Sequence, residues 1–374
     1  MQNYVQGKHR KEVMGNRIRI KDIAKKAKVS TGTVDRVIHN RGNVSAEKRA
    51  RVKQVMEELG YEPNIIARTL ASRKVLRIAI LLPNPAIDPY WELPNKGIEK
   101  AWQSARHYGI EVETTYFNLF DQTDFAAKAA KVMKAKPGAL VFPPVFLRAA
   151  TDLLEQCHKR GIPVSIFNTE LSGKNVLTYV GQNSYQSGVL AGKLLSIGLG
   201  PSGKVAVVNL SKEPANAKHL SDKAKGLVDY FQSEGIGDAG RIQKVVFEDF
   251  QDDLALRRFL MELLHREPDL RGFFVTNSRS YRILDALRPG ELDQIKIVGF
   301  DLLPQNIKYL EAGAIQFLIN QNPVEQGYLS LMSLVHKLIF DKKVDPIQHL
   351  PLDIVVAENA RYYLEREEKY ALVV

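Results

Sequence analysis

The sequence predicts two folded parts: a small all-α helix-turn-helix domain, and behind it a large α/β body whose parallel sheets and flanking helices form two lobes. Three observations predict this. Two short amphipathic segments with a tight connection between them lie within residues 17–62. From residue 75 onward, short β-rich runs alternate with amphipathic helical stretches. The excess of positive charge is confined to about the first fifth of the chain.

The charge distribution indicates a polyanionic partner for the N-terminal part. Residues 1–77 contain 19 Lys and Arg but only 7 Asp and Glu, which leaves 34 and 35 of the chain's totals of 53 and 42 for the remainder. A basic segment joined to a nearly neutral body favours binding of nucleic acid. The alternative is a solvated basic tail, but the ordered helical pattern within this segment argues against it.

Length and composition exclude several classes of protein. A chain of 374 residues is too long for one ordinary core, and 45% hydrophobic with 25% charged residues is typical of globular proteins. The single cysteine, Cys157, cannot form an intrachain disulfide and is expected to be a free buried thiol in a reducing compartment. The first 17 residues have no apolar core, and no run of about 18 apolar residues follows. We therefore expect a cytoplasmic protein without a membrane partner.

The head is predicted to contain three short helices after a flexible basic arm at residues 1–16. Ser30 is placed to cap the second helix, the third is expected to begin near Ser45, and Gly60 fits its end. Apolar residues at helical spacing form one stripe on each helix. These stripes consist of Ile20, Ile23, Ala24 and Ala27, then Val34, Val37 and Ile38, then Val52, Val55, Met56 and Leu59.

In a helix-turn-helix the second helix lies in the major groove of DNA, with its N-terminal residues facing the base edges. Arg36 is the best candidate for base readout because a guanidinium can pair bidentately with guanine, although a phosphate contact or a solvated side chain is the alternative. Several basic residues would mostly meet phosphates. The exposed positions of the second helix are Thr31, Gly32, Thr33, Asp35, Arg36 and His39, and the phosphate candidates are Lys21, Lys25, Lys26, Lys28, Arg41 and Lys48.

The run from Ile20 to Ser72 resembles the head of the LacI/GalR family of transcription regulators almost end to end, through DIA, VS–TV–RV, LGY–PN and A–L. The resemblance implies that residues 17–62 are the DNA-binding domain and residues 63–74 a hinge helix and linker. In the family the hinge becomes helical on operator DNA and a leucine wedges into the minor groove. Such a helix is marginal alone, and an apolar wedge kinks the duplex. The matching hinge positions are Asn64, Ala67, Arg68 and Leu70. The alternative for Leu70 is ordinary interdomain packing.

Two residues of the head depart from the family pattern. Gly32 stands where the family often has a long polar side chain that reads bases. Asp35 stands where a small hydroxyl residue near phosphate is common. Its carboxylate would be repelled by phosphate or would accept a hydrogen bond from cytosine N4.

The body, residues 75–374, contains ten β-rich runs separated mostly by helical stretches, too many for one compact parallel sheet. Ligands of such sheets bind beyond the carboxyl ends of the strands, which predicts a site in the cleft between two lobes. The runs are LRIAILL, VETTYF, ALVF, VSIF, LTYV, KVAVVNL, KVVF, GFFVT, IKIVGF and IQFLI.

The body resembles the type I periplasmic sugar-binding fold, as the LacI/GalR body does, through IAILLPNPAIDPYW, TYVGQNSYQSGVLAGKLL, FVTNS, IVGFD and ENARYY. The resemblance implies three passages of the chain between the lobes, dimerisation through the body and a sugar-like effector. The short tail after ENARYY has no leucine heptads, so we expect a homodimer rather than a tetramer.

Candidate effector contacts follow the strands. Flat aromatic rings stack on sugar faces, whereas carboxylates and amides pair with hydroxyls. Lys223 matches a position where the family often has arginine, so the bidentate fork of arginine would be missing. The effector-binding candidates are Asp88, Tyr90, Trp91, Lys223, Asn277 and Asp301, with Asn168 and Glu170 following VSIF. Their alternatives are helix caps, turns and, for Trp91, core packing.

The sequence motifs do not support an enzyme. GLGPSGK has phosphate-loop spacing, but Val205 replaces the required Ser or Thr and the motif precedes a strand. No GxGxxG follows the first predicted strand, no GxSxG or HExxH occurs in the sequence, one cysteine cannot build a zinc cluster, and neighbouring Cys157 and His158 point apart on a helix. We expect no enzymatic activity, no cofactor and no metal.

The leading hypothesis is a DNA-binding transcription regulator, a repressor by family habit, whose affinity for double-stranded operator DNA depends on a sugar-like effector. A solute-binding protein without DNA is the second class, and it predicts a signal peptide and no basic head. An enzyme on the α/β body is the third class, and it predicts a catalytic constellation at the strand ends.

Overall fold

A computed structural model describes residues 18–38, 41–61, 75–171, 173, 175–199, 203–212, 218–236 and 240–372. The chain separates into two compact units, residues 1–72 and residues 73–374. The expected arm at residues 1–16, the hinge at residues 63–74 and His39 lie outside the described residues.

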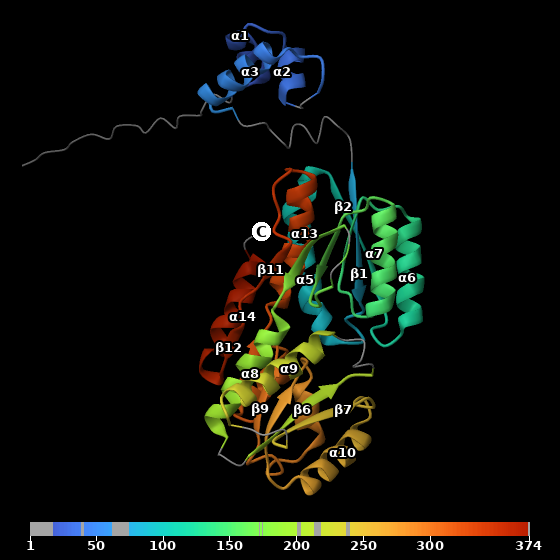
Figure 1. The fold of residues 1–374 in the computed structure, drawn as a ribbon, viewed down its shortest axis with the longest axis vertical. Coiled ribbons are helices and arrows are strands. Elements are labelled where there is room, and N and C mark those ends of the chain that lie inside the picture. The colour runs from blue at the N-terminus through green and yellow to red at the C-terminus, as the bar shows by residue number, and fades with distance from the viewer. Residues whose placement is uncertain are drawn as a thin grey trace, which may run out of the picture. The chain divides into compact units, whose positions relative to one another are not determined.

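The head unit contains the three expected helices (Figure 1). The turn between the first two is tight because Lys28 adopts a left-handed conformation with φ of 54°. The Ser30 hydroxyl accepts a hydrogen bond from the Thr33 amide at 3.1 Å, and the Ser45 hydroxyl caps the third helix by accepting from Lys48 N at 3.4 Å. The helices are α1 (Ile20–Ala27), α2 (Thr31–Ile38) and α3 (Ala46–Glu58).

The core of the head consists of the predicted stripes. Seven aliphatic residues are buried where the three helices meet, and the remaining stripe residues pack against them partly buried. Gly60 follows α3 with φ of 60°, a left-handed conformation that glycine adopts at little cost, and so ends the helix as predicted. The buried residues are Ile23, Ala24, Ala27, Val34, Val37, Val52 and Val55.

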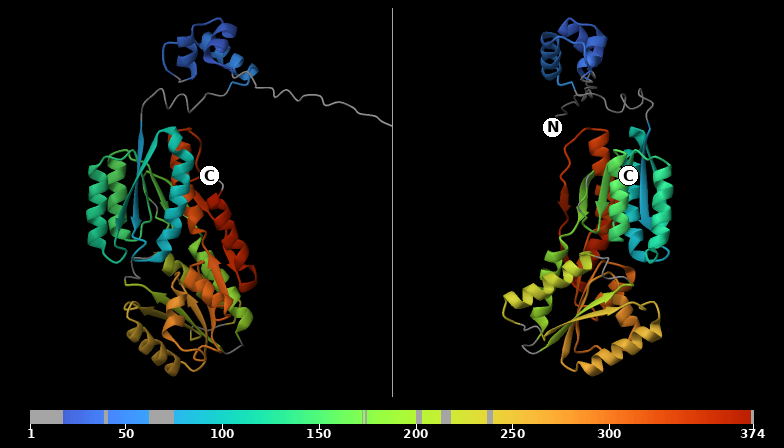
Figure 2. Two further views of the ribbon diagram at one scale, coloured as in Figure 1. Left: turned by 180° about the vertical axis from the view of Figure 1, so that it is seen from behind. Right: turned by 45° about the vertical axis from the view of Figure 1, so that its right-hand side comes forward.

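The first lobe of the body, the N-lobe, contains a sheet in the order β11-β5-β4-β3-β1-β2, and all its described pairings are parallel. Helices α6 and α7 pack on one face, and α5 and α13 on the other (Figures 1 and 2). Its elements are β1 (Leu76–Pro83), η1 (Pro89–Trp91), α5 (Glu92–Ala105), η2 (Arg106–Tyr108), β2 (Ile110–Phe117), α6 (Gln122–Lys134), β3 (Ala139–Phe142), α7 (Leu147–Lys159), β4 (Val164–Phe167), β5 (Val176–Gly181), α13 (Pro323–Leu338) and β11 (Ile347–His349).

The second lobe, the C-lobe, repeats this plan with the order β12-β10-β9-β8-β6-β7, in which β12 alone among the described strands is antiparallel to its neighbour. Its elements are α8 (Ser184–Gly198), β6 (Lys204–Leu210), α9 (Lys218–Ser233), β7 (Ile242–Phe247), α10 (Asp253–Arg266), β8 (Leu270–Val275), α11 (Ser280–Ala286), β9 (Lys296–Phe300), α12 (Pro304–Glu311), β10 (Phe317–Asn320), β12 (Asp353–Val355) and α14 (Ala357–Leu372). This architecture confirms the predicted two-lobed α/β body.

The order of the strands shows how the chain connects the lobes. Within the described residues it passes between them three times, after β5, after β10 and between β11 and β12. All ten predicted strands are present, whereas the short strands β11 and β12 were not predicted. The segment GLGPSGK precedes β6, as the sequence indicated, so it does not have the topology of a phosphate loop.

Glycines set the closest helix contacts in each lobe. A Cβ at Gly97 of α5 would lie 1.9 Å from the Val324 carbonyl oxygen of α13, and one at Gly188 of α8 would lie 1.9 Å from the Lys223 carbonyl oxygen of α9. Real Cβ atoms do not approach this closely, so each helix pair crosses backbone against backbone. In the C-lobe this contact fixes the position of Lys223.

Two further expectations concern the described residues. Cys157 is buried as a free thiol, its sulfur lies 3.8 Å from that of Met133, and burial raises its pKa to about 11. Within the described part of the chain, no helix combines the length and the apolar character that crossing a membrane requires.

Candidate functional site

The exposed face of α2 carries the predicted base-reading residues. Thr31, Gly32 and Arg36 are exposed, whereas Thr33 is partly buried and its hydroxyl lies 3.0 Å from that of Ser30. Thr33 is therefore engaged in capping α2, and Arg36 has the longest exposed side chain among these four. Their contacts with DNA stay predictions.

Two ion pairs modify the charge of the head surface. Arg41 Nη1 donates to the Asp35 carboxylate at 3.4 Å, which supplies a cation to the acidic residue that departs from the family pattern. Lys26 Nζ lies 2.8 Å from Glu58 of α3. Both pairs are exposed, so their contribution to stability is small, but they reduce the free positive charge at Lys26 and Arg41.

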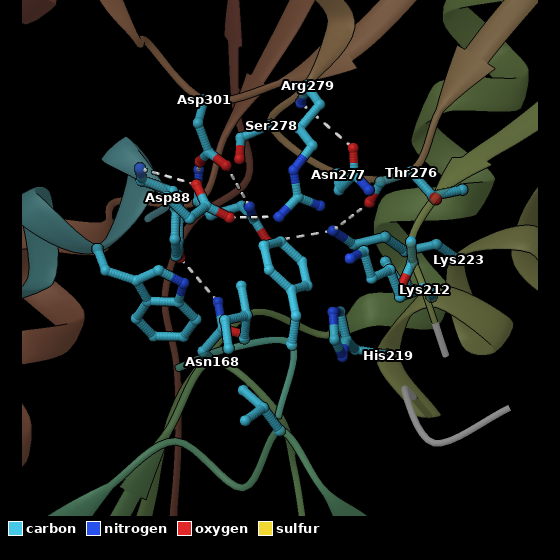
Figure 3. A pocket seen from close by; sticks show the side chains of 18 of the residues that line it. Asp88, Asn168, Lys212, His219, Lys223, Thr276, Asn277, Ser278, Arg279 and Asp301 are labelled. Carbon is cyan, nitrogen blue, oxygen red and sulfur yellow. Dashed lines mark hydrogen bonds and ion pairs between the residues drawn. The ribbon is translucent and has the colours of Figure 1, made fainter. Parts of the chain in front are cut away.

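The body contains a pocket of about 120 Å³ at the carboxyl ends of strands from both lobes. The predicted effector-binding residues line one pocket although they are up to 213 positions apart in the chain (Asp88 to Asp301), and Asn168 joins them (Figure 3). Glu170 lines a neighbouring hollow instead, so the structure does not bring it into this pocket. The pocket-lining candidates are Asp88, Tyr90, Trp91, Lys223, Asn277 and Asp301.

The N-lobe contributes an aromatic wall. Tyr90 and Trp91 are buried and meet edge to face at 5.1 Å between ring centroids, and Trp91 also packs against Phe167 at 6.2 Å. The Tyr90 hydroxyl accepts a hydrogen bond from Asn168 Nδ2 at 2.7 Å. Burial, and next the charge of Asp301, hold the pKa of Tyr90 well above its usual range, so the hydroxyl stays protonated and can donate.

Lys223 is the buried cation of the pocket. It is 1% exposed, and its Nζ donates to the Thr276 carbonyl oxygen at 3.0 Å and to Gln321 Oε1 at 3.2 Å. Nζ also lies 3.5 Å from the ring centroid of Phe300, a cation–π contact. Burial lowers the pKa of this ammonium below its usual value, and the nearby charge of Asp301 opposes that effect.

Asp301 and Gln321 connect the pocket to the segments that join the lobes. Asp301 is fully buried with φ of 64°, and its carboxylate accepts from Gln321 Nε2 at 2.5 Å and from Gln321 N at 3.3 Å. Gln182 Nε2 donates to Gln321 Oε1. Because Gln182 follows β5 and Gln321 follows β10, this hydrogen bond ties two of the three connections between the lobes together.

The structure adds pocket residues that sequence reasoning missed. Arg279 donates to the Asp88 carboxylate and, at 3.0 Å, to the Leu210 carbonyl oxygen. His219 Nδ1 lies 3.0 Å from the Thr169 hydroxyl across the cleft, and burial together with the charge of Lys223 lowers its pKa to about 3. The position of Arg279, two residues after Asn277 at the end of β8, was the available signal.

Asn277 acts within its own lobe. Its Nδ2 donates to the Leu210 carbonyl oxygen at 3.0 Å, and its Oδ1 accepts from the Arg279 amide at 3.2 Å. Asn277 therefore orients the loop that carries Arg279. Among the described residues, no group of three or more His, Cys, Asp or Glu is arranged to hold a metal ion.

Replacing Lys223 with methionine is expected to reveal a pH-dependent cost of the buried ammonium. Between its lowered native pKa and the ordinary value of 10.5, the unfolded chain holds a proton that the native chain has released. The free energy of unfolding contributed by Lys223 therefore rises with pH across that window. Urea denaturation of wild type and K223M over this range measures the difference, and a pH-independent difference would contradict the assignment.

Comparison with known proteins identifies the family. Residues 19–64 match the family of bacterial regulatory proteins of the lacI type, and residues 78–342 match the periplasmic binding protein domain. The chain belongs to the periplasmic binding protein domain family through its body, and its head is a LacI-family DNA-binding domain. This confirms the resemblance found for the head and for the body.

Relatives of the chain are named as transcription regulators. The regulator MalR of Streptococcus pneumoniae is 39% identical over 101 residues, which cover 26% of this chain and only 30% of MalR. The ribose operon repressor of Halalkalibacterium halodurans is 24% identical over 349 residues, which cover 91% of this chain and 97% of that repressor. Both relatives carry the names of transcription regulators, which agrees with the prediction of a regulator.

Solved structures agree on the fold of the body. A LacI transcriptional regulator from Bacteroides fragilis superposes with a TM-score of 0.69 and 26% identity, over 78% of this chain and all of that chain. GanP, a glucose-galactose binding protein from Geobacillus stearothermophilus, superposes with a TM-score of 0.66 and 20% identity, over 76% of this chain and 99% of that chain. The second likeness concerns the fold alone.

Proposed function

We propose that this LacI-family regulator binds an operator in double-stranded DNA and that a small sugar or sugar derivative in the cleft changes its affinity for that operator. One observation carries the proposal: a single chain joins a helix-turn-helix head with an exposed recognition helix to a two-lobed body with a pocket at its strand ends. The pocket is the natural ligand site of such a sheet.

The chemistry of the pocket supports a polyhydroxylated ligand. Asp88 pairs with Arg279, and the charge of Lys223 interacts with that of Asp301, so these four charges compensate one another, while Lys212 of the pocket lining lies over the ring of Phe120 at 5.4 Å. Hydroxyl groups both donate and accept hydrogen bonds, and they can therefore contact either member of each pair. Tyr90 supplies part of the apolar wall on which a sugar ring stacks.

The size of the pocket favours one small ligand. The pocket between the lobes has a volume of about 120 Å³, which suits a monosaccharide better than a longer saccharide. We assign effector contacts to the six predicted residues and add Asn168, Arg279 and Gln321. The six are Asp88, Tyr90, Trp91, Lys223, Asn277 and Asp301.

For the head we propose contacts with DNA from the exposed face of α2, with Arg36 reading a base. Recognition helices of this type act in pairs, so we propose a homodimer on a palindromic operator.

The hinge contacts fall outside the described residues and stay predictions for Asn64, Ala67, Arg68 and Leu70, as does the contact of His39. A protein that binds chromosomal DNA acts in the cytoplasm, which we propose as its location.

Coupling between the two sites requires an element that both can bias. The hydrogen bond between Gln182 and Gln321 is suited to this role, because it joins two lobe connections and, through Gln321, contacts Asp301 and Lys223. By linkage, the operator must change effector affinity by the same factor as the effector changes operator affinity. The ribose operon repressor among the relatives supports repression as the direction of control.

Operator selection tests the proposal directly. The full-length protein is expected to enrich a palindromic sequence from a library of random duplexes, with binding that weakens steeply as salt rises. Aldopentoses and aldohexoses are then added singly to the labelled duplex, and one of them should shift the affinity by roughly 5- to 150-fold. Failure to enrich any duplex rejects DNA binding, whereas enrichment without a response to any sugar rejects the ligand class alone.

A further inference from the structure

One ion pair crosses the pocket from lobe to lobe. Asp88 belongs to the N-lobe, in the loop between β1 and η1, and Arg279 belongs to the C-lobe, in the loop between β8 and α11. Arg279 Nη2 donates to Asp88 Oδ2, and Figure 3 shows the two side chains directed toward each other over the pocket.

Each member of the pair is held by its own lobe. Asp88 Oδ1 accepts from the Tyr90 amide at 3.2 Å and so caps η1 of the N-lobe. Arg279 Nη1 donates to the Leu210 carbonyl oxygen of the C-lobe at 3.0 Å, and the Arg279 amide donates to Asn277 Oδ1. The pair therefore links two anchored loops, and it can persist only while the lobes are close together.

Aromatic rings from both lobes surround the guanidinium. Its carbon atom lies 4.8 Å from the ring centroid of Phe250 in the C-lobe and 5.8 Å from that of Phe120 in the N-lobe. The two rings meet at 5.8 Å, and Phe120 packs against the core of the C-lobe. Only 11% of the Arg279 side chain and 8% of the Asp88 side chain are exposed.

Opening of the lobes would hydrate both groups, and closing removes that water. A desolvated ion pair favours the closed state only if its remaining donors and acceptors also find partners. Leu210 and Tyr90 provide such partners here, and a charge-assisted bond is stronger than a neutral one. A second polar contact across the cleft, between Thr169 and His219, is neutral because His219 is unprotonated at neutral pH.

We propose that Asp88 and Arg279 form an interlobe clasp, which stabilises the closed cleft when no effector is bound. Arg279 of the C-lobe holds the Asp88 loop of the N-lobe in position. This goes beyond the proposed function, because the closure concerns the body alone and requires neither DNA nor a sugar. Where the sugar effector does bind, its apparent affinity depends on how much of the protein is already closed.

Distance measurements on the effector-free, full-length protein test the clasp. Nitroxide labels are attached to cysteines introduced at the exposed positions Ala127 of α6 and Glu262 of α10, one in each lobe, while Cys157 is buried and stays unlabelled. Pulsed dipolar spectroscopy should give one short, narrow distance for the otherwise unaltered chain. R279Q should shift it to longer and broader values, and R279K should restore most of the short population.

The partner variant and the control make the result specific. D88N should open the lobes as R279Q does, and the double variant should open them no further, because both changes remove one interaction. R257Q breaks a comparable ion pair, with Glu291 at 2.9 Å, that lies wholly within the C-lobe, and it should leave the distance unchanged. Cooperative thermal unfolding verifies that each variant is folded. If R279Q does not fold, D88N alone tests whether loss of the ion pair opens the lobes.

Two outcomes would overturn the clasp. One is that the folded R279Q and D88N variants keep the short distance, and the other is that R257Q opens the lobes as much as they do. Because the measurement contains neither duplex nor sugar, these outcomes are independent of whether the proposed function succeeds or fails.

Discussion

Replacement of Asp301 with alanine is expected to lower the free energy of unfolding of the body by about 3–5 kcal/mol, the cost of breaking a buried charge pair from one side. Asp301 is fully buried, and its charge is the one that opposes the desolvation of the Lys223 ammonium. Without it, Lys223 must either remain a buried cation beside Phe300 with neutral partners only or give up its proton. The same change removes an acceptor from the pocket, so loss of sugar binding is expected as well.

Denaturant unfolding of the full-length protein measures this effect. D301A/K223M should recover part of the lost stability, because the second change removes the uncompensated cation. D341A is the matched control: Asp341 also has a left-handed backbone, with φ of 49°, and also pairs with a lysine, Lys337 at 2.7 Å, but it is exposed. Equal losses for D301A and D341A would show that burial of the charge is not the cause.

Replacement of Arg36 with alanine is expected to weaken binding to the selected operator by about 1–3 kcal/mol, or roughly 5- to 150-fold. Arg36 is exposed on α2, whose buried face is fixed by Val34 and Val37 in the core of the head. Removing a bidentate base contact should also relax specificity at one base pair of each half-site.

Fluorescence anisotropy with the operator and with a scrambled duplex, over a range of salt, measures the change. K25A is the matched control, because Lys25 is exposed on α1 and would contact phosphate. It should weaken binding to both duplexes alike and lower the salt slope by about 1. If R36A also weakens both duplexes alike, Arg36 contacts phosphate rather than a base.

The head shows how much of a structure local sequence patterns can predict. Its three helices and their buried residues follow from apolar spacing, and the ends of α2 and α3 follow from Ser30, Ser45 and Gly60, whereas the left-handed Lys28 that ends α1 was not predicted. The ten longer strands follow equally well, because each is a β-rich run between helical stretches. The strands β11 and β12 did not, since each spans three residues, too few to show a period, and each exists only because a neighbouring strand is already in place.

The pocket residues also fall into those that the sequence could predict and those that it could not. Residues in the loops after predicted strands, such as Asp88 and Asp301, could be nominated because parallel strands end at one edge of a sheet. Gln321 directly follows the predicted strand β10, so the same rule could have nominated it, whereas His219 could not be nominated because nothing local distinguishes it from other polar residues at helix starts. Their role depends on which connection between the lobes passes beside Asp301 and which helix crosses beside Gly188.

The sequence by itself determined that a basic three-helix head precedes a two-lobed α/β body, and it determined which strand ends line the pocket. Only the tertiary structure decided how the charges pair: Arg279 with Asp88 across the cleft, and Lys223 near Asp301 beneath it. The physical reason is the separation along the chain between the residues that make each kind of contact. Helix and strand periods record contacts between neighbours in the chain, whereas an ion pair between residues 191 positions apart arises only when the two lobes fold and close.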